Sequence, residues 1–148
     1  MEQQSKELIE RYVTASATVT KRLSSEIAKI VQDDMTVDQY QTLYYIKTQH
    51  ECTSTELADA FCVGKSSITA IITRLVDRGL VERTRDKEDR RLVYLSLTEL
   101  GHEISSKADE KVQEVVAKYL VHFNQEEIES FITSFEKLAR LFEEGSKE

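Results

Sequence analysis

Apolar residues recur at three- and four-residue steps along most of the chain, which is the spacing of one face of an α-helix. The first such stretch covers residues 5–31, and its length suggests packing along another long helix or another chain. Three further stretches begin at Thr36, Thr53 and Asn124, each followed three residues later by Gln or Glu. This is the capping-box pattern, in which the two side chains satisfy each other's free backbone N–H groups. The pattern therefore predicts three more helix starts.

A further helix is predicted over 65–78, because Gly79 suits the left-handed position just beyond a helix end. Its apolar face consists of Ile68, Ile71, Ile72, Leu75 and Val76. Its opposite face carries Ser66, Ala70, Thr73, Arg74 and Asp77, with Ser67 and Thr69 at the margins. These side chains are mostly small and rich in hydroxyl groups, whereas an ordinary solvated face in this chain is richer in Glu and Lys. We therefore expect this helix to approach another surface closely.

Beyond that glycine the apolar period changes from 3.6 residues to two, which predicts strands over 80–84 and 92–97. The loop between them, 85–91, is entirely charged, as a hairpin loop in water would be. Thr98 then caps a long helix over 99–123. The fold class is thus mostly α with a small β-hairpin wing: a winged helix-turn-helix between long N- and C-terminal helices.

Composition supports this fold. The 148 residues correspond to one domain and include no proline and only four glycines, so few helices are interrupted. No run of about 18 apolar residues is present, which predicts no membrane span. The N-terminus lacks the apolar core and cleavage site of a secretory signal, so we expect a cytoplasmic protein.

Charge is distributed unevenly along the chain. The net charge is −7, yet residues 65–91 hold eight Lys/Arg against five Asp/Glu, a net charge of +3. The other 121 residues carry −10. Positive charge confined to one segment predicts a surface that meets nucleic acid phosphate.

The predicted elements fit double-stranded DNA. A helix with small side chains can enter a major groove about 12 Å wide, where Arg74 and Lys65 reach base edges or phosphates. The hairpin loop falls beside it, where an arginine can enter the negatively charged minor groove.

Two motifs resemble the MarR (multiple antibiotic resistance regulator) family. One is the wing, RDKEDRR at 85–91 followed by LTELG at 97–101, and the other is LVDRGLV at 75–81. The resemblance covers essentially the whole chain. It implies that Arg91 enters the minor groove while Asp89 orients it. It further implies a homodimer that represses transcription from a pseudo-palindromic operator.

On this basis 1–148 forms a single MarR-like domain, with a DNA-binding region at 36–97 and dimerisation helices within 5–31 and 99–144. The predicted DNA-binding residues are Lys65, Ser66, Ser67, Thr69, Ala70, Thr73, Arg74, Arg85, Lys87, Asp89, Arg90 and Arg91. The resemblance also implies a small-molecule effector crevice where the dimer helices meet the DNA-binding region, and Tyr40 and Tyr44 are the candidates to line it.

Other chemistry has less support. Cys52 and Cys62 are too few and too loosely spaced for a disulfide framework or a zinc site, and Cys62 is expected to be an inert, partly buried thiol. The three histidines are scattered, and no nucleophile–base or phosphate-loop motif is present. We therefore expect that the protein is not an enzyme and binds no metal or cofactor. Two alternatives stay open: a winged-helix protein-interaction module without a specific DNA site, and a thiol-based redox-sensing regulator.

Overall fold

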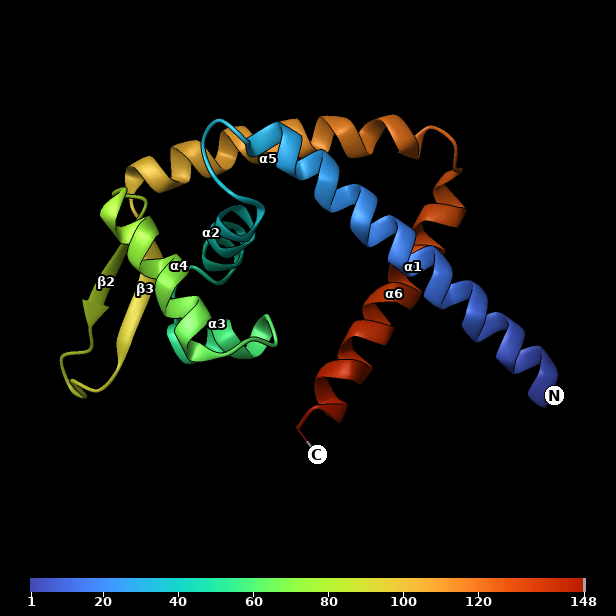
Figure 1. The fold of residues 1–148 in the computed structure, drawn as a ribbon, viewed down its shortest axis with the longest axis horizontal. Helices are drawn as coiled ribbons and strands as arrows, with labels where there is room; N and C mark the ends of the chain where they lie inside the picture. The colour runs from blue at the N-terminus through green and yellow to red at the C-terminus, as the bar shows by residue number, and fades with distance from the viewer. Residues whose placement is uncertain (148) are drawn as a thin grey trace. The chain divides into compact units, whose positions relative to one another are not determined.

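The computed structural model describes residues 1–147, and nine helices and strands lie within them (Figure 1). Their bounds are α1 Glu2–Val31, α2 Val37–Gln49, β1 Cys52–Thr53, α3 Ser54–Ala60, α4 Lys65–Asp77, β2 Val81–Arg85, β3 Val93–Leu97, α5 Glu99–Leu120 and α6 Gln125–Gly145. The chain forms two compact units, Met1–Val112 and the segment from Gln113 onward. None of the helices in the described residues is both long and apolar enough to pass through a membrane.

The predicted fold class is confirmed, with small differences at the element ends. The first helix begins at Glu2 instead of residue 5, and α5 ends at Leu120 instead of 123. Both predicted strands are present, each beginning one residue later than expected.

One element was not predicted. The two-residue strand β1 pairs antiparallel with β3, placing Cys52 opposite Leu95, and the sheet order is β1–β3–β2. Two residues are too short to show the alternation by which a strand is recognised in a sequence. Both Cys52 and Leu95 are buried, so this edge of the sheet closes over the core.

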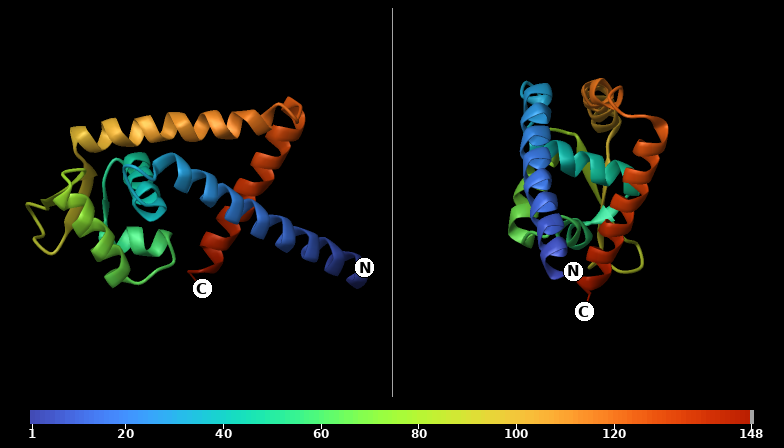
Figure 2. Two further views of the ribbon diagram at one scale, coloured as in Figure 1. Left: turned by 45° about the horizontal axis from the view of Figure 1, so that its top comes forward. Right: turned by 90° about the vertical axis from the view of Figure 1, so that its right-hand side faces the viewer.

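The core of the first unit lies between α2, α3, α4 and the sheet. Its fully enclosed side chains include Leu43, Ile46, Leu57, Ile68, Ile72, Leu75, Leu80 and Leu95. Every residue of this set comes from the region predicted as a winged helix-turn-helix. Strands β2 and β3 lie beside α4, and the loop that joins them projects away from the helices (Figures 1 and 2).

Two of the three predicted capping boxes are complete. Thr36 and Asn124 each accept a hydrogen bond from the backbone N–H three residues on, and the residue at that position bonds back to the cap. At Thr53 the hydroxyl oxygen accepts from the Glu56 N–H at 3.1 Å, which is the first half of the motif. The three helices nevertheless begin where predicted.

The end of α4 confirms the role predicted for Gly79. Its φ is 75°, its N–H donates to the Val76 carbonyl, and the Leu80 N–H donates to the Leu75 carbonyl. This pair of bonds is a Schellman motif, which requires a left-handed residue at the position of Gly79.

The end of α3 has the same motif with a cysteine in the glycine position. Cys62 has φ 55°, its N–H donates to Asp59, and the Val63 N–H donates to Ala58. Because the chain turns away from the helix here, the Cys62 side chain is exposed. The expectation of a partly buried thiol at Cys62 was therefore wrong.

Residues 98–101, at the end of the wing motif, connect the start of α5 by hydrogen bonds to the chain that leaves α4. The Thr98 hydroxyl donates to the Gly79 carbonyl, its N–H donates to the Leu80 carbonyl at 3.1 Å, and its oxygen accepts from the Gly101 N–H at 3.0 Å. A Cβ on Gly101 would overlap the Leu80 carbonyl oxygen. The motif thus holds the first turn of α5 against the chain that leaves α4.

Two long helices keep their apolar faces exposed. On α1 these side chains include Leu8, Ile9, Tyr12, Val13 and Val19. On α6, in the second unit, they include Phe131, Ile132, Phe135, Leu141 and Phe142. The Phe131 and Phe135 rings are stacked 5.3 Å apart, and no residue of α6 is buried. Apolar patches of this extent generally mark interaction surfaces.

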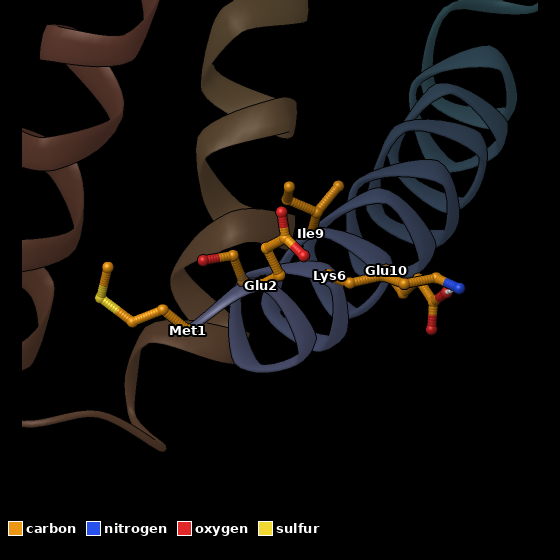
Figure 3. A pocket seen from close by; sticks show the side chains of 6 residues that line it. Met1, Glu2, Lys6, Ile9 and Glu10 are labelled. Carbon is orange, nitrogen blue, oxygen red and sulfur yellow. Dashed lines mark ion pairs between the residues drawn. The ribbon is translucent and has the colours of Figure 1, made fainter.

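An open hollow lies on the first turns of α1 (Figure 3). It is lined by Met1, Glu2, Ser5, Lys6, Ile9 and Glu10. Lys6 and Glu10 form an exposed ion pair there at 3.9 Å, as helix neighbours four residues apart often do. The hollow is formed by one helix face and gathers no set of convergent polar groups.

Candidate nucleic-acid interface

The outer face of α4 is polar and open. Its apolar side is fixed by burial of Ile68, Ile72 and Leu75 in the core, which turns the opposite side outward. All seven predicted site residues of α4 are exposed: Lys65, Ser66, Ser67, Thr69, Ala70, Thr73 and Arg74. The structure thus brings these seven onto one accessible helix.

The first turn of α4 also favours the binding of a negatively charged group. Its N-cap is Gly64, which has no side chain to satisfy the free N–H groups, and the turn contains no acidic residue. Backbone N–H groups at a helix start attract phosphate oxygens. A duplex against this end of α4 would therefore meet both these groups and the Lys65 ammonium.

In the wing loop, Asp89 holds Arg91. Its carboxylate accepts hydrogen bonds from the Arg91 backbone N–H at 3.1 Å, from Nε at 3.1 Å and from Nη2 at 3.3 Å. The bonds from the Arg91 side chain and backbone lower the pKa of the Asp89 carboxyl. The Arg91 side chain is 91% exposed, so the pair fixes its direction and leaves its remaining surface free.

The other wing cations differ in their roles. Arg85 donates from Nη1 to the Arg90 carbonyl at 2.8 Å, which closes the loop across its base. Lys87 and Arg90 are exposed. Arg85 therefore stabilises the loop by a hydrogen bond in addition to contributing its charge.

Sequence reasoning missed one contact between the hairpin and α4. Arg83 of β2 donates from Nη2 to the Thr73 hydroxyl oxygen at 3.3 Å. Strand alternation places Arg83 on the same side as Val81 and Arg85, but it does not say which helix that side faces. That information comes only from the packing of β2 beside α4.

A buried polar network connects α2 to α5. The Tyr40 hydroxyl donates to one Asp109 oxygen at 2.7 Å, and the Lys47 ammonium donates to the other at 2.9 Å. Lys47 also donates to the Ser106 hydroxyl at 3.2 Å. Burial, followed by the bond to Asp109 and its charge, raises the pKa of the Tyr40 hydroxyl. This network links the predicted DNA-binding region to α5 within one compact unit.

The two predicted effector residues lie next to each other but differ in access. The rings of Tyr40 and Tyr44 have centroids 6.4 Å apart. Tyr40 is buried and bonded to Asp109, whereas Tyr44 is 50% exposed. An incoming molecule would therefore reach Tyr44 first.

The described residues contain no group of three or more His, Cys, Asp or Glu arranged to hold a metal ion. Cys52 is buried, and this burial, together with the charge of Glu56, raises the pKa of its thiol to about 11. A thiol in that state is mostly protonated and weakly reactive at neutral pH.

Comparison with known proteins places this arrangement in a family. The model of the MarR family matches residues 35–93. The uncharacterised HTH-type transcriptional regulator YpoP of Bacillus subtilis is 30% identical over 120 residues, covering 81% of this chain and 85% of its own. The homoprotocatechuate degradative operon repressor of Escherichia coli is 24% identical over 112 residues, 76% of each chain.

The fold has matches among solved structures as well. A cysteine-to-serine mutant of MarR from Escherichia coli, solved in complex with operator DNA, has a TM-score of 0.69 at 24% identity and covers 88% of this chain and 92% of that one. A likeness at this identity concerns the fold. The match of the family model and the similarity to YpoP over most of both chains show that this chain belongs to the MarR family of DNA-binding transcriptional regulators.

Proposed function

We propose that this protein is a homodimeric repressor that binds a pseudo-palindromic operator sequence-specifically and is released by a small molecule or another signal. The observation that carries the proposal is the joint exposure of the α4 polar face and of Arg91, held by Asp89, in a chain whose remaining residues are acidic on balance. Charge of this kind attracts phosphate at one place, and small side chains allow close approach to bases.

We assign DNA binding and dimerisation to different parts of the chain. Residues 36–97 form the DNA-binding region, in which α4 enters the major groove and Arg91 the minor groove. The helices within 5–31 and 99–144 form the dimer, which supplies a partner for the apolar faces of α1 and α6. Two copies of α4 would then lie about one helical turn of DNA apart, as in other helix-turn-helix dimers.

Repression and release rest on separate arguments. A similar protein is a repressor of a degradative operon, which favours repression here too. An effector near Tyr44 would lie beside the Tyr40–Asp109 contact that joins α2 to α5. A ligand that prefers one geometry of that contact shifts the DNA affinity by the difference between its own affinities for the two states.

The test begins with selection of duplexes from a random-sequence library by the full-length protein, followed by mobility-shift titration. Arg91→Ala should weaken binding to most sequences and flatten its salt dependence, because it removes a positive charge from the minor groove. Thr73→Ala and Arg74→Ala should instead change which bases are tolerated, by roughly 1–3 kcal/mol for each base contact.

Lys147→Ala is the control, because it removes one exposed positive charge beyond the end of α6, outside both the DNA-binding region and the helices proposed to form the dimer. It should leave the selected sequence unchanged. If the wild-type protein enriches no sequence, or if Arg91→Ala and Thr73→Ala bind like wild type, the proposal fails.

A further inference from the structure

Thr69 and Thr73 are one turn apart on the exposed side of α4, but their hydroxyl groups are used differently. The Thr69 hydroxyl donates to the carbonyl of Lys65, four residues earlier, at 2.8 Å. This is a common bond for threonine within a helix. Thr73 makes no such bond in the described part of the chain, and its oxygen instead accepts from Arg83 at 3.3 Å.

The bond to Arg83 determines the hydrogen-bonding role left to Thr73. A guanidinium carries only donors, so the threonine oxygen must be the acceptor. The hydroxyl hydrogen is then free to point away from Arg83, and α4 is exposed on that side. Arg83 occupies one of the two lone pairs of the Thr73 oxygen and leaves its hydrogen available as an outward donor, whereas Thr69 has committed its hydrogen to the helix.

The position of Arg83 is fixed by the sheet. It lies in the middle of β2, paired with Leu95 of β3, which is buried in the core. Val81, two residues earlier on the same side of the strand, is buried as well. The backbone that carries the guanidinium is therefore rigid, and only the side chain itself crosses from β2 to α4.

We propose that Arg83 is a positioning residue that sets the base preference of Thr73 by holding its hydroxyl as a donor. This inference rests on the proposed DNA-binding function and deepens it. In the major groove, guanine O6 and N7, adenine N7 and thymine O4 are acceptors, whereas cytosine presents only a donor. Thr73 therefore favours an acceptor-bearing base, and that preference depends on a strand residue outside α4.

The test compares four variants on one set of duplexes. The probes are a duplex selected from a random library by the wild-type protein and the complete set of its single base-pair substitutions. Arg83→Met removes the donors and the charge, Arg83→Lys keeps the charge, and Thr73→Val removes the hydroxyl at nearly equal size. The fourth variant combines Arg83→Met with Thr73→Val.

The expected result is that both Arg83→Met and Thr73→Val relax the preference at the same base pair, by roughly 5- to 100-fold. Arg83→Lys relaxes it too while keeping the salt dependence of wild type, since a point charge lacks the guanidinium fork. The double variant relaxes it no further than either single one, because both changes remove one interaction.

Lys87→Met is the matched control, since it removes one exposed charge from the same hairpin and leaves the Thr73 contact in place. It should weaken binding evenly across all duplexes. Thermal unfolding of each variant, with Arg83 exposed, should match wild type.

Three outcomes overturn the inference alone. In the first, Arg83→Met weakens binding to all duplexes evenly while Arg83→Lys behaves like wild type, which would mean that Arg83 makes a phosphate contact only. In the second, Arg83→Met and Thr73→Val affect different base pairs, or their effects add in the double variant. In the third, neither change alters the base preference. If the wild-type protein selects no duplex at all, the proposed function fails, and the inference fails with it.

Discussion

Helices α4 and α1 have the same kind of sequence pattern and opposite surroundings. Leu75 of α4 is 0% exposed, because the apolar side of that helix packs into the core of its own unit. Leu8 of α1 is 55% exposed, and the residues around it on the same stripe are exposed too. An amphipathic pattern thus shows that a helix has an apolar partner, but not whether the partner lies in the same chain.

The polar sides of the two helices differ as well. On α4 this side consists mostly of short hydroxyl side chains and an arginine. On α1 it also carries Glu and Lys, where Lys6 pairs with Glu10 and Lys29 with Glu26. In the proposed function, the polar side of α4 meets DNA and the apolar side of α1 meets the second copy of the chain. The following predictions test this contrast, beginning with the largest effect.

Leu75→Ala should destabilise the fold strongly. Removing a fully enclosed leucine costs about 2–5 kcal/mol of unfolding free energy, because a cavity remains where the side chain was. Urea denaturation followed by circular dichroism measures this loss, which should not depend on protein concentration. A loss below about 1 kcal/mol would mean that α4 is not closed into the core as described.

Tyr40→Phe tests whether the stability of the first unit also depends on the polar network of Tyr40, Lys47 and Asp109. It removes the hydroxyl that donates to Asp109, and a hydrogen bond to a charged group contributes about 1.5–3 kcal/mol. Denaturation at pH 7 measures the loss. Tyr44→Phe is the matched control, because Tyr44 is 50% exposed on the same helix and lies outside the helices proposed to form the dimer, and it should leave the unfolding free energy unchanged.

The same variant gives a pH signature. The folded state raises the pKa of Tyr40, so above the ordinary tyrosine value of about 10 the folded chain binds a proton that the unfolded chain has lost. The contribution of Tyr40 is therefore fully present below about pH 10 and decreases as the pH rises beyond it. Alkaline unfolding of Tyr40→Phe should show less of this decrease, and identical pH profiles would contradict the network.

Gly101→Ala should destabilise, although alanine is normally the better helix residue. The added Cβ would overlap the Leu80 carbonyl oxygen, and relieving such overlap costs about 1–3 kcal/mol. Gly145→Ala in α6 is the matched control, since nothing lies within 4 Å of its added Cβ. Thermal unfolding should separate the two, with a lowered midpoint for Gly101→Ala alone.

Leu8→Ala is the counterpart of Leu75→Ala on the open helix. We expect it to weaken the proposed dimer by about tenfold or more, since truncating a central interface residue costs about 1–2 kcal/mol. Sedimentation equilibrium measures the dissociation constant. A wild-type protein that is monomeric at all concentrations would refute the proposed dimer, and with it the explanation given for the exposed stripe.

Local signals explain which parts of the molecule could be predicted from the sequence. Capping residues at Thr36 and Asn124, the glycine at 79 and the change of period at 80 each act over a few residues, so the helices and the hairpin were predicted within a few residues. The Asp89–Arg91 pair is likewise two residues apart, and it entered through the family motif. Contacts between distant segments left no such signal. Tyr40 with Asp109, Arg83 with Thr73, and Cys52 opposite Leu95 all depend on how elements pack.

The smallest predicted effect concerns the two Schellman motifs, which differ in the residue at their left-handed position. Gly79 adopts φ 75° without a steric penalty, whereas Cys62 adopts φ 55° with a Cβ that disfavours it. Cys62→Gly should therefore raise the unfolding free energy by about 0.5–1 kcal/mol, even though glycine adds freedom to the unfolded chain. Cys62→Ala, which keeps the Cβ and removes the thiol, should leave stability near wild type. If Cys62→Ala stabilises as much as Cys62→Gly, the thiol, and not the backbone conformation, lowers the unfolding free energy of wild type. The left-handed position at the end of α3 would then carry no steric penalty.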